Sequence, residues 1–365
     1  MRSKYTMEWK NEKIVAFRSA LIDWYEENKR ILPWRENTDA YRIWVSEIML
    51  QQTKVDTVMP YFERFMSWFP TMKDFAEAPE ERILKVWEGL GYYSRVRNLQ
   101  AAMKTVVTEM GGVVPNDLEG ILALKGVGPY TAGAVLSIAY EKPEPAVDGN
   151  VMRVISRILE IDDDIMKQKT RKKFEAALYP LIDPEKPGEF NQALMEIGAL
   201  VCTPKKPMCL VCPLQDFCEA HKVGKEESYP VKVKKTKVKR IFLSSAIVKI
   251  GEDKYIIEQR PETGLLANLW QFPTVDLAEN NEAMKLAFLQ KYGIELQMES
   301  EPITHVKHIF SHLIWEVDVF VAQAIHTQTT ELKTKTVTKA EMEHLAFPVP
   351  YQKMWQAFLK EETIQ

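Results

Sequence analysis

Residues 124–132 read LKGVGPYTA, a short glycine-rich segment between two stretches with helical periodicity. Gly126 and Gly128 predict a tight turn here, because glycine accepts the positive φ angles that such a turn requires. The backbone N–H groups of the turn would point outward at the start of the following helix, where they can hold an anion. Taken alone, a Gly-x-Gly turn more often only connects two helices.

A second motif, residues 145–154, reads PAVDGNVMRV. Asp148 lies between an apolar pair, Ala146 and Val147, and the polar Gly149 and Asn150. An isolated Asp-Gly of this kind is well explained as the N-cap of the next helix. A functional role for Asp148 therefore needs support from the neighbouring motifs.

The third feature is a group of four cysteines, the only ones in the chain, with the spacing C-x6-C-x2-C-x5-C: Cys202, Cys209, Cys212 and Cys218. Four thiolates that converge on one point suit a soft metal site. The spacing favours a 4Fe-4S cluster over structural zinc, which more often uses two separated pairs of ligands. A disulfide framework is disfavoured, because residues 1–13 form no apolar leader in this chain of 365 residues. We therefore expect a reducing compartment, the cytoplasm.

The length of 365 residues predicts two domains, either of which could bury a full core. A net charge of −3 and a pI near 6.2 do not identify a nucleic-acid binder, so any such binding must come from local patches. No apolar run is long enough to span a bilayer, so we expect no membrane partner. The first 220 or so residues have helical periodicity and predict an all-α region, with helical stretches near 14–24, 41–52, 55–68, 80–88, 95–109 and 131–140.

Residues 229–240, YPVKVKKTKVKR, carry six basic side chains and no acid, and we interpret them as a linker. A solvated connector without a partner explains the basic charge equally well. After the linker the apolar period shifts towards two, as in Trp315, Val317, Val319 and Val321. A helix is expected at about 280–292, with Gly293 as its C-cap. The second half is therefore predicted to be α+β.

The three motifs, in this order, resemble the helix-hairpin-helix DNA glycosylase superfamily in its iron–sulfur branches, the endonuclease III and MutY types. The resemblance implies a 4Fe-4S cluster on the four cysteines and DNA phosphate contacts at Gly126, Gly128, Lys205 and Lys206. It also implies that Asp148 is catalytic and that Asn150 helps to hold it.

Two positions favour the MutY branch. Endonuclease III enzymes carry a lysine where this chain has Tyr130, and a phenol cannot form the imine that their lyase step needs. Glu47 lies in WVSEIMLQQT, which resembles the active-site helix of MutY-type adenine DNA glycosylases, where the matching glutamate is the general acid. Without the resemblance, Glu47 would be interpreted as a surface residue of its helix. In the family's chemistry, Glu47 protonates the adenine, Asp148 stabilises the sugar cation, and Tyr130 hydrogen-bonds to the pair.

The same resemblance assigns residues that would open the DNA. It implies a wedge made of Leu50, Gln52 and Tyr92, and a pocket for the extruded adenine made of Trp34, Arg35 and Gln192. Some relatives have glutamate at the position of Gln192. Leu50 and Tyr92, taken singly, are also consistent with ordinary core residues.

The second half resembles a Nudix-like fold, because GLLANLWQFP at 264–273 matches the entry to the Nudix helix. The acids that would hold magnesium are replaced by Ala287, Gln290 and Lys291, so we expect recognition without hydrolysis. The segment HIFSHL at 308–313 resembles the loop with which MutY-type enzymes recognise 8-oxoguanine, which implies that role for Phe310, Ser311 and His312. For Phe-Ser-His alone, an ordinary strand end is as good an explanation.

We therefore expect a multidomain chain: a helical glycosylase region at 1–228, the linker at 229–240 and a Nudix-like domain at 241–365. Within the first region, a six-helix barrel with the hairpin is expected at about 31–139, and the iron–sulfur part at 1–30 and 140–221. The expected activity is removal of adenine from 8-oxoguanine:adenine or guanine:adenine mispairs in duplex DNA, by a monomer, with no efficient lyase step. An endonuclease III-like glycosylase-lyase and a non-catalytic iron–sulfur DNA sensor are the alternatives.

Overall fold

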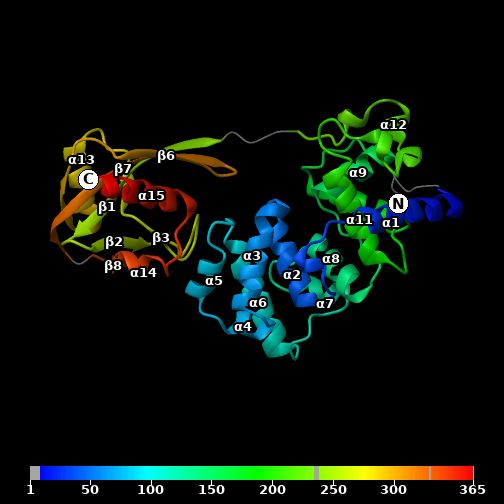
Figure 1. The fold of residues 1–365 in the computed structure, drawn as a ribbon, viewed down its shortest axis with the longest axis horizontal. Helices are drawn as coiled ribbons and strands as arrows, with labels where there is room; N and C mark the ends of the chain where they lie inside the picture. Colours follow the sequence, from blue (N-terminus) through cyan, green and yellow to red (C-terminus); the bar gives the residue numbers. More distant parts are fainter. Residues whose placement is uncertain (1–8, 234–237, 329, 365) are drawn as a thin grey trace. The chain divides into compact units, whose positions relative to one another are not determined.

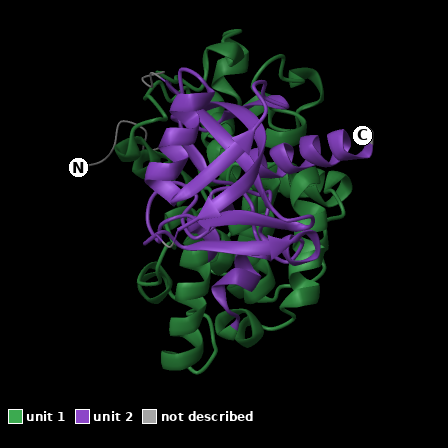
Figure 2. Ribbon diagram, turned by 90° about the vertical axis from the view of Figure 1, so that its left-hand side faces the viewer, with its two compact units in different colours: residues 1–77, 97–234 green, residues 78–96, 235–365 purple. Residues whose placement is uncertain are grey.

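The structure, a computed structural model, describes residues 9–233, 238–328 and 330–364 (Figure 1). It divides into two compact units, one of residues 1–77 and 97–234, the other of residues 78–96 and 235–365 (Figure 2). Residues 234–237 of the predicted linker lie outside the described residues. Among the residues that are described, none of the helices combines the length and apolar character needed to cross a bilayer.

Unit 1 is helical, as the periodicity of the sequence predicts. Its helices are α1 (Asn11–Asn28), α2 (Ala40–Leu50), α3 (Val55–Trp68), α4 (Met72–Glu77), α6 (Ser94–Glu109, which begins in unit 2), α7 (Leu118–Leu122), α8 (Pro129–Tyr140), α9 (Gly149–Leu159), α10 (Gln168–Leu178), α11 (Pro187–Leu200) and α12 (Glu219–Lys222). Short 3-10 turns are η1 (Pro33–Arg35), η2 (Cys209–Val211), η3 (Gln215–Phe217) and η4 (Glu226–Ser228).

The LKGVGPYTA segment forms the turn between α7 and α8. Asp117 caps α7 by accepting a hydrogen bond from the Gly120 N–H at 2.8 Å, and Pro129 occupies the first turn of α8. Gly126 has a φ of +78°, and a Cβ added there would lie 2.7 Å from Cβ of Asn98. Only glycine fits this turn without displacing its neighbour. The predicted hairpin is thus confirmed.

Helices α1, α9 and α11 share a hydrophobic core of unit 1, which supports one wall of the site described below. The core contains fully buried aromatic and aliphatic side chains, among them Phe17, Leu21, Ile155, Phe190 and Ile197. Close approach of α9 and α11 depends on Gly198, where an added Cβ would lie 2.7 Å from Cβ of Asn150. The position of Asn150 is therefore fixed by helix packing as well as by hydrogen bonds.

Unit 2 is a mixed sheet with helices on both faces, which confirms the α+β expectation. Its central pair is β1 (Lys239–Ile250) and β7 (Leu313–Thr327), which run parallel. The other strands are β2 (Lys254–Gln259), β3 (Trp270–Gln271), β4 (Thr274–Asp276), β5 (Ile294–Met298), β6 (Thr304–Ile309) and β8 (Thr334–Thr338), and the helices are α5 (Glu80–Val86), α13 (Asn281–Tyr292), α14 (Lys339–Met342) and α15 (Val349–Ile364).

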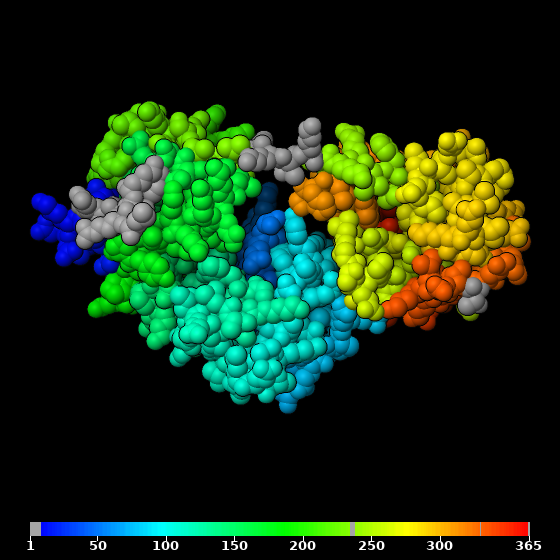
Figure 3. All heavy atoms as spheres, turned by 180° about the vertical axis from the view of Figure 1, so that it is seen from behind, coloured from blue at the N-terminus to red at the C-terminus, as the bar shows by residue number. Residues whose placement is uncertain are grey.

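The two sequence predictions for this half are confirmed in detail. The alternating stretch from Trp315 to Val321 lies in β7, and Trp315, Val317 and Val319 are buried on the face that packs against α15. Helix α13 covers the other face and ends at Gly293, whose φ of +66° provides the left-handed C-cap. The β6–β7 hairpin and the beginning of β1, which pairs with it, extend together at one end of the sheet (Figure 1), and their orange and yellow-green atoms lie side by side in the space-filling view (Figure 3).

Candidate active site

Unit 1 contains a cavity of about 560 Å³ into which α2, α8, α9 and α11 all contribute side chains. It brings together eleven of the residues singled out from the sequence: Trp34, Arg35, Glu47, Leu50, Gln52, Gly126, Gly128, Tyr130, Asp148, Asn150 and Gln192. These residues are spread over 159 positions of the sequence, from Trp34 to Gln192. Their convergence is a property of the fold that no single motif contains.

Glu47 lies on α2 with only 5% of its surface exposed. Its carboxylate accepts a hydrogen bond from the hydroxyl of Tyr130, which projects from the first turn of α8. The pKa of Glu47 is raised to about 7. Burial is the main cause and the nearby charge of Asp148 adds to it, whereas the Tyr130 hydrogen bond acts in the opposite direction. Burial and the two carboxylates also raise the pKa of Tyr130 well above its ordinary value. Glu47 therefore exchanges its proton near neutral pH, while Tyr130 stays protonated.

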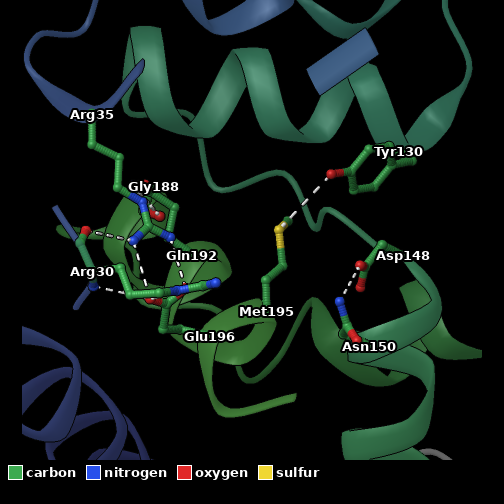
Figure 4. Close-up of polar contacts among 9 residues, drawn as sticks. All are labelled: Arg30, Arg35, Tyr130, Asp148, Asn150, Gly188, Gln192, Met195 and Glu196. Atoms are coloured by element: carbon green, nitrogen blue, oxygen red, sulfur yellow. Dashed lines mark hydrogen bonds and ion pairs between the residues drawn. The ribbon is translucent and has the colours of Figure 1, made fainter. Parts of the chain in front are cut away.

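Asp148 is the N-cap of α9. One carboxylate oxygen accepts from the Val151 N–H at 2.7 Å, and the other accepts from Nδ2 of Asn150 at 3.0 Å (Figure 4). Burial raises the pKa of Asp148, and these two hydrogen bonds oppose the rise. Asn150 is itself oriented by Arg153, which donates to its Oδ1 at 2.9 Å. The cavity thus holds the carboxyl groups of Glu47 and Asp148 in different surroundings.

One wall of the cavity is a buried ion cluster that sequence reasoning missed. Glu196, on α11 and 1% exposed, accepts hydrogen bonds from Arg30 (2.8 and 2.9 Å) and from Arg35 (3.0 and 3.3 Å; Figure 4). Burial alone would raise the pKa of Glu196, but the hydrogen bonds from Arg30 and Arg35 outweigh it and lower the pKa to about 2. The only signal in the sequence is an acid inside an otherwise apolar run, ALMEIGAL.

The remaining residues predicted for the pocket and the wedge differ in their burial and contacts. Trp34 is buried and meets the ring of Phe62 edge-on, whereas Gln192 donates to the Gly188 carbonyl at 3.3 Å. Leu50 ends α2, and Gln52 is exposed with a φ of +58°. Tyr92 belongs to unit 2 and does not line the cavity.

The four cysteines surround a small cavity of about 30 Å³, together with Arg157, His221 and Glu226. Burial raises the pKa of the Cys209 thiol to about 11 and that of Cys212 to about 12, so the thiolate forms need a bound cation to stabilise them. Buried Arg157 donates to Sγ of Cys202 at 3.2 Å, an outer hydrogen bond of the kind that surrounds metal sulfur ligands. This donor set fits an all-cysteine cluster. Lys205 and Lys206 lie exposed on the loop between the first two cysteines.

The predicted reading loop forms the turn between β6 and β7. Ser311 and His312 are exposed at the turn, whereas Phe310 packs against His308 and Trp315, with ring centroids 4.5 and 5.0 Å apart. The turn is closed by the Phe310 N–H, which donates to the Leu313 carbonyl at 2.8 Å. On α13, Lys291, one of the positions at which the sequence predicts that metal-binding acids are replaced, donates to the Thr274 carbonyl at 2.7 Å.

Comparison with known families gives three matches along the chain. Residues 45–180 match the HhH-GPD superfamily base excision DNA repair protein, residues 202–218 match the iron-sulfur binding domain of endonuclease III, and residues 245–357 match the NUDIX domain. The second match decides between iron–sulfur and zinc. The cofactor of this chain is a 4Fe-4S cluster, which the four cysteines would hold.

Two relatives illustrate how far the similarity extends. The adenine DNA glycosylase of Rattus norvegicus is 38% identical, over 87% of this chain and 72% of the relative. The adenine DNA glycosylase of Buchnera aphidicola subsp. Schizaphis graminum is 32% identical, over 94% of this chain and 99% of the relative.

Solved structures agree for the helical part. A thermostable thymine-DNA glycosylase is 29% identical and superposes with a TM-score of 0.53 over 58% of this chain and 98% of its own. An endonuclease III–DNA covalent intermediate, 23% identical with a TM-score of 0.50 over 59% of this chain and 99% of its own, shares the fold. With a helix-hairpin-helix glycosylase fold, an iron–sulfur loop and a Nudix-like domain in one chain, this protein belongs to the MutY-type family of adenine DNA glycosylases.

Proposed function

We propose that this enzyme removes adenine mispaired with 8-oxoguanine or guanine by hydrolysing its N-glycosidic bond, without an efficient strand-cutting step. The observation that carries the proposal is the presence of Glu47 and Asp148 in one cavity, with Tyr130 hydrogen-bonded to Glu47. The family provides the adenine DNA glycosylase chemistry, and the residue roles that follow are our assignments.

Glu47 is the general acid. Adenine leaves poorly as an anion, so a proton must reach a ring nitrogen such as N7 as the bond from N9 to the sugar breaks. A carboxyl group with a pKa of about 7 is half protonated at neutral pH and can give that proton to the base. The hydroxyl of Tyr130 holds the Glu47 side chain in place during the transfer.

Asp148 stabilises the sugar. When the base departs with the bonding electrons, positive charge develops on the sugar ring, and an ionised carboxylate beside it lowers the energy of that state. The hydrogen bonds from Val151 and Asn150 favour the ionised form of Asp148. Water then adds to the sugar carbon and leaves an intact strand with an abasic site. Tyr130 supplies no amine for a Schiff base, which disfavours a lyase step.

The surrounding residues would hold the DNA. We assign Trp34, Arg35 and Gln192 to the extruded adenine and Leu50, Gln52 and Tyr92 to the space that it leaves. Gly126 and Gly128, with exposed Lys205 and Lys206, would contact phosphates. The 4Fe-4S cluster would brace the loop that carries the two lysines. We assign no step of base removal to it.

The reading loop would select the partner base. A serine hydroxyl both donates and accepts hydrogen bonds, so exposed Ser311 can distinguish 8-oxoguanine, with its extra carbonyl and its N7–H, from guanine. Phe310 anchors the loop on Trp315, and His312 adds a polar contact.

Substituting alanine for Ser311 is therefore expected to lower the preference for 8-oxoguanine:adenine over guanine:adenine by about fivefold, the effect of one neutral hydrogen bond. The preference is the ratio of the single-turnover rates of adenine release from two duplexes that differ only in the partner base. Ser300→Ala, at another exposed serine of unit 2, serves as the matched control. An unchanged ratio in Ser311→Ala would remove the loop from our proposal.

A further inference from the structure

Residues 78–96 interrupt the helical half of the sequence, yet they pack as part of unit 2 (Figure 2). The segment contains α5, a glycine-rich turn and Tyr92. Unit 2 therefore carries two DNA-contacting elements of the proposed function, the Tyr92 wedge and the reading loop at 310–312. How these two elements are connected is visible in the hydrogen bonds of the segment.

Two charged side chains fasten the segment to unit 2. Lys85 and Glu88 bond to each other at 2.8 Å. Glu88 also accepts from the backbone N–H of Phe347 at 2.7 Å, and Lys85 donates to the Leu345 carbonyl at 2.9 Å. Both side chains are mostly shielded, with 22% and 19% of their surfaces exposed, so the contacts are weakly screened by solvent. We call this set of contacts the 85–88 clasp.

From the clasp, a series of aromatic contacts leads to the reading loop. The Phe347 ring stacks on Phe272 at 5.7 Å, and Phe272 meets Tyr351 at 6.4 Å. Tyr351 meets Trp315 at 6.3 Å, and Trp315 meets Phe310 of the reading loop at 5.0 Å. Packed aromatic rings leave little free volume, so a displacement at one end is resisted along the whole series.

On the other side of the clasp, the turn before Tyr92 is held rigidly. The Trp87 indole donates to the Gly91 carbonyl at 3.2 Å, and Arg95 donates to the same carbonyl at 3.1 Å. Tyr92 adopts a left-handed φ of +47°, is 46% exposed, and has the Arg95 guanidinium 5.5 Å from its ring centre. The wedge side chain is thus presented on a preorganised turn that starts directly after Glu88.

We propose that Lys85 and Glu88 are positioning residues that couple Tyr92 of the wedge to the reading loop. Recognition of the partner base and opening of the base stack then depend on the same unit of the protein. The proposal rests on the proposed function for the roles of Tyr92 and Ser311. Lys85 and Glu88 are not among the residues that line the cavity of unit 1. Because of the clasp, Tyr92 inserted beside 8-oxoguanine and Ser311, which recognises that base, keep fixed positions relative to each other.

The test is a double-mutant cycle with Glu88→Ala and Ser311→Ala, measured as the ratio of single-turnover adenine release from 8-oxoguanine:adenine and guanine:adenine duplexes. Glu88→Ala should lower the ratio about fivefold in the otherwise unchanged protein, and by less than about twofold in the Ser311→Ala protein. Glu88→Gln keeps an oxygen that accepts from Phe347 and should recover most of the loss. Glu81→Ala, an exposed glutamate of α5, is the matched control. Faster hydrogen exchange at the Phe347 amide in Glu88→Ala would report the opened clasp directly.

The possible outcomes distinguish failure of the coupling from failure of the proposed function. If Glu88→Ala and Glu81→Ala have the same ratio, or if Glu88→Ala and Ser311→Ala have additive effects, the coupling is refuted while the proposed function stands. If the unchanged protein releases adenine but has no preference for 8-oxoguanine, the role of the reading loop in the proposed function fails; if it releases no adenine, the proposed function itself fails. Should Glu88→Ala not fold, Lys85→Ala, which removes the hydrogen bond to the Leu345 carbonyl and the ion pair with Glu88, carries the same cycle with the same two outcomes.

Discussion

Replacing Asp148 with asparagine is expected to lower the single-turnover rate of adenine removal by about a thousandfold or more, while mismatch binding stays largely intact. Asparagine is as good an N-cap as aspartate, so its side-chain oxygen can keep the hydrogen bond from the Val151 N–H and α9 should be retained. What is lost is the negative charge beside the sugar, together with the oxygen that accepts from Nδ2 of Asn150. Rates and binding are measured on the same 8-oxoguanine:adenine duplex.

Asp117→Asn is the matched control, because Asp117 also caps a helix of unit 1 and accepts from the Gly120 N–H at 2.8 Å. It should leave both rate and binding close to those of the unchanged protein. If Asp148→Asn loses binding and activity together, Asp148 is a structural cap and our assignment of the sugar-stabilising group is wrong.

Glu47→Gln is expected to have the second largest effect, a loss of about a hundredfold to ten-thousandfold at pH 7, the range for removing a general acid. The pKa of Glu47 is raised from 4.5 to about 7, so the group is protonated below pH 7 and loses its proton as the pH rises. Since the protonated form is the active one, the rate of the unchanged protein should fall on the alkaline side of pH 7. In Glu47→Gln that alkaline decline should be absent, because the amide does not titrate.

The measurement is the single-turnover rate of adenine release between pH 5.5 and 9, with Glu63→Gln, an exposed glutamate of α3, as control. An alkaline decline that persists in Glu47→Gln would assign the titrating group to another residue. A rate that already falls steadily from pH 5.5 upward in the unchanged protein would mean that Glu47 is solvated and that its pKa stays near the ordinary value of 4.5.

The local features of the site could be predicted because each one depends on residues within a single short stretch of sequence. The turn at Gly126 needs a glycine, the cysteines have a distinctive spacing, and Asp148 and Glu47 lie in recognisable motifs. What could not be predicted depends on contacts between distant segments. The ion pairs of Glu196 could not be predicted, because they form only when α11 places it against Arg30 and Arg35, more than 160 positions earlier in the sequence.

In unit 2, too, local features could be predicted from the sequence and contacts between distant segments could not. Alternating apolar residues identified β7, and Gly293 marked the end of α13. The parallel pairing of Lys239–Lys249 with Leu313–Gln323 joins segments about 74 residues apart, and periodicity gives no information about which strands pair. Residues 78–96 belong to unit 2 through contacts with residues far along the sequence, among them the hydrogen bond from the Phe347 N–H to Glu88. No composition shift marks that segment.

The central claim is that the carboxyl pair of unit 1 removes adenine by hydrolysis, and one measurement tests it most directly. The purified protein is incubated with a duplex containing a single 8-oxoguanine:adenine pair, and strand breakage at the adenine is quantified with and without hot alkali. We predict release of free adenine and breakage chiefly after alkali, because hydrolysis leaves an intact abasic strand. Equal breakage without alkali would mean a lyase, and binding without release of adenine would mean a DNA sensor; either result would contradict the account.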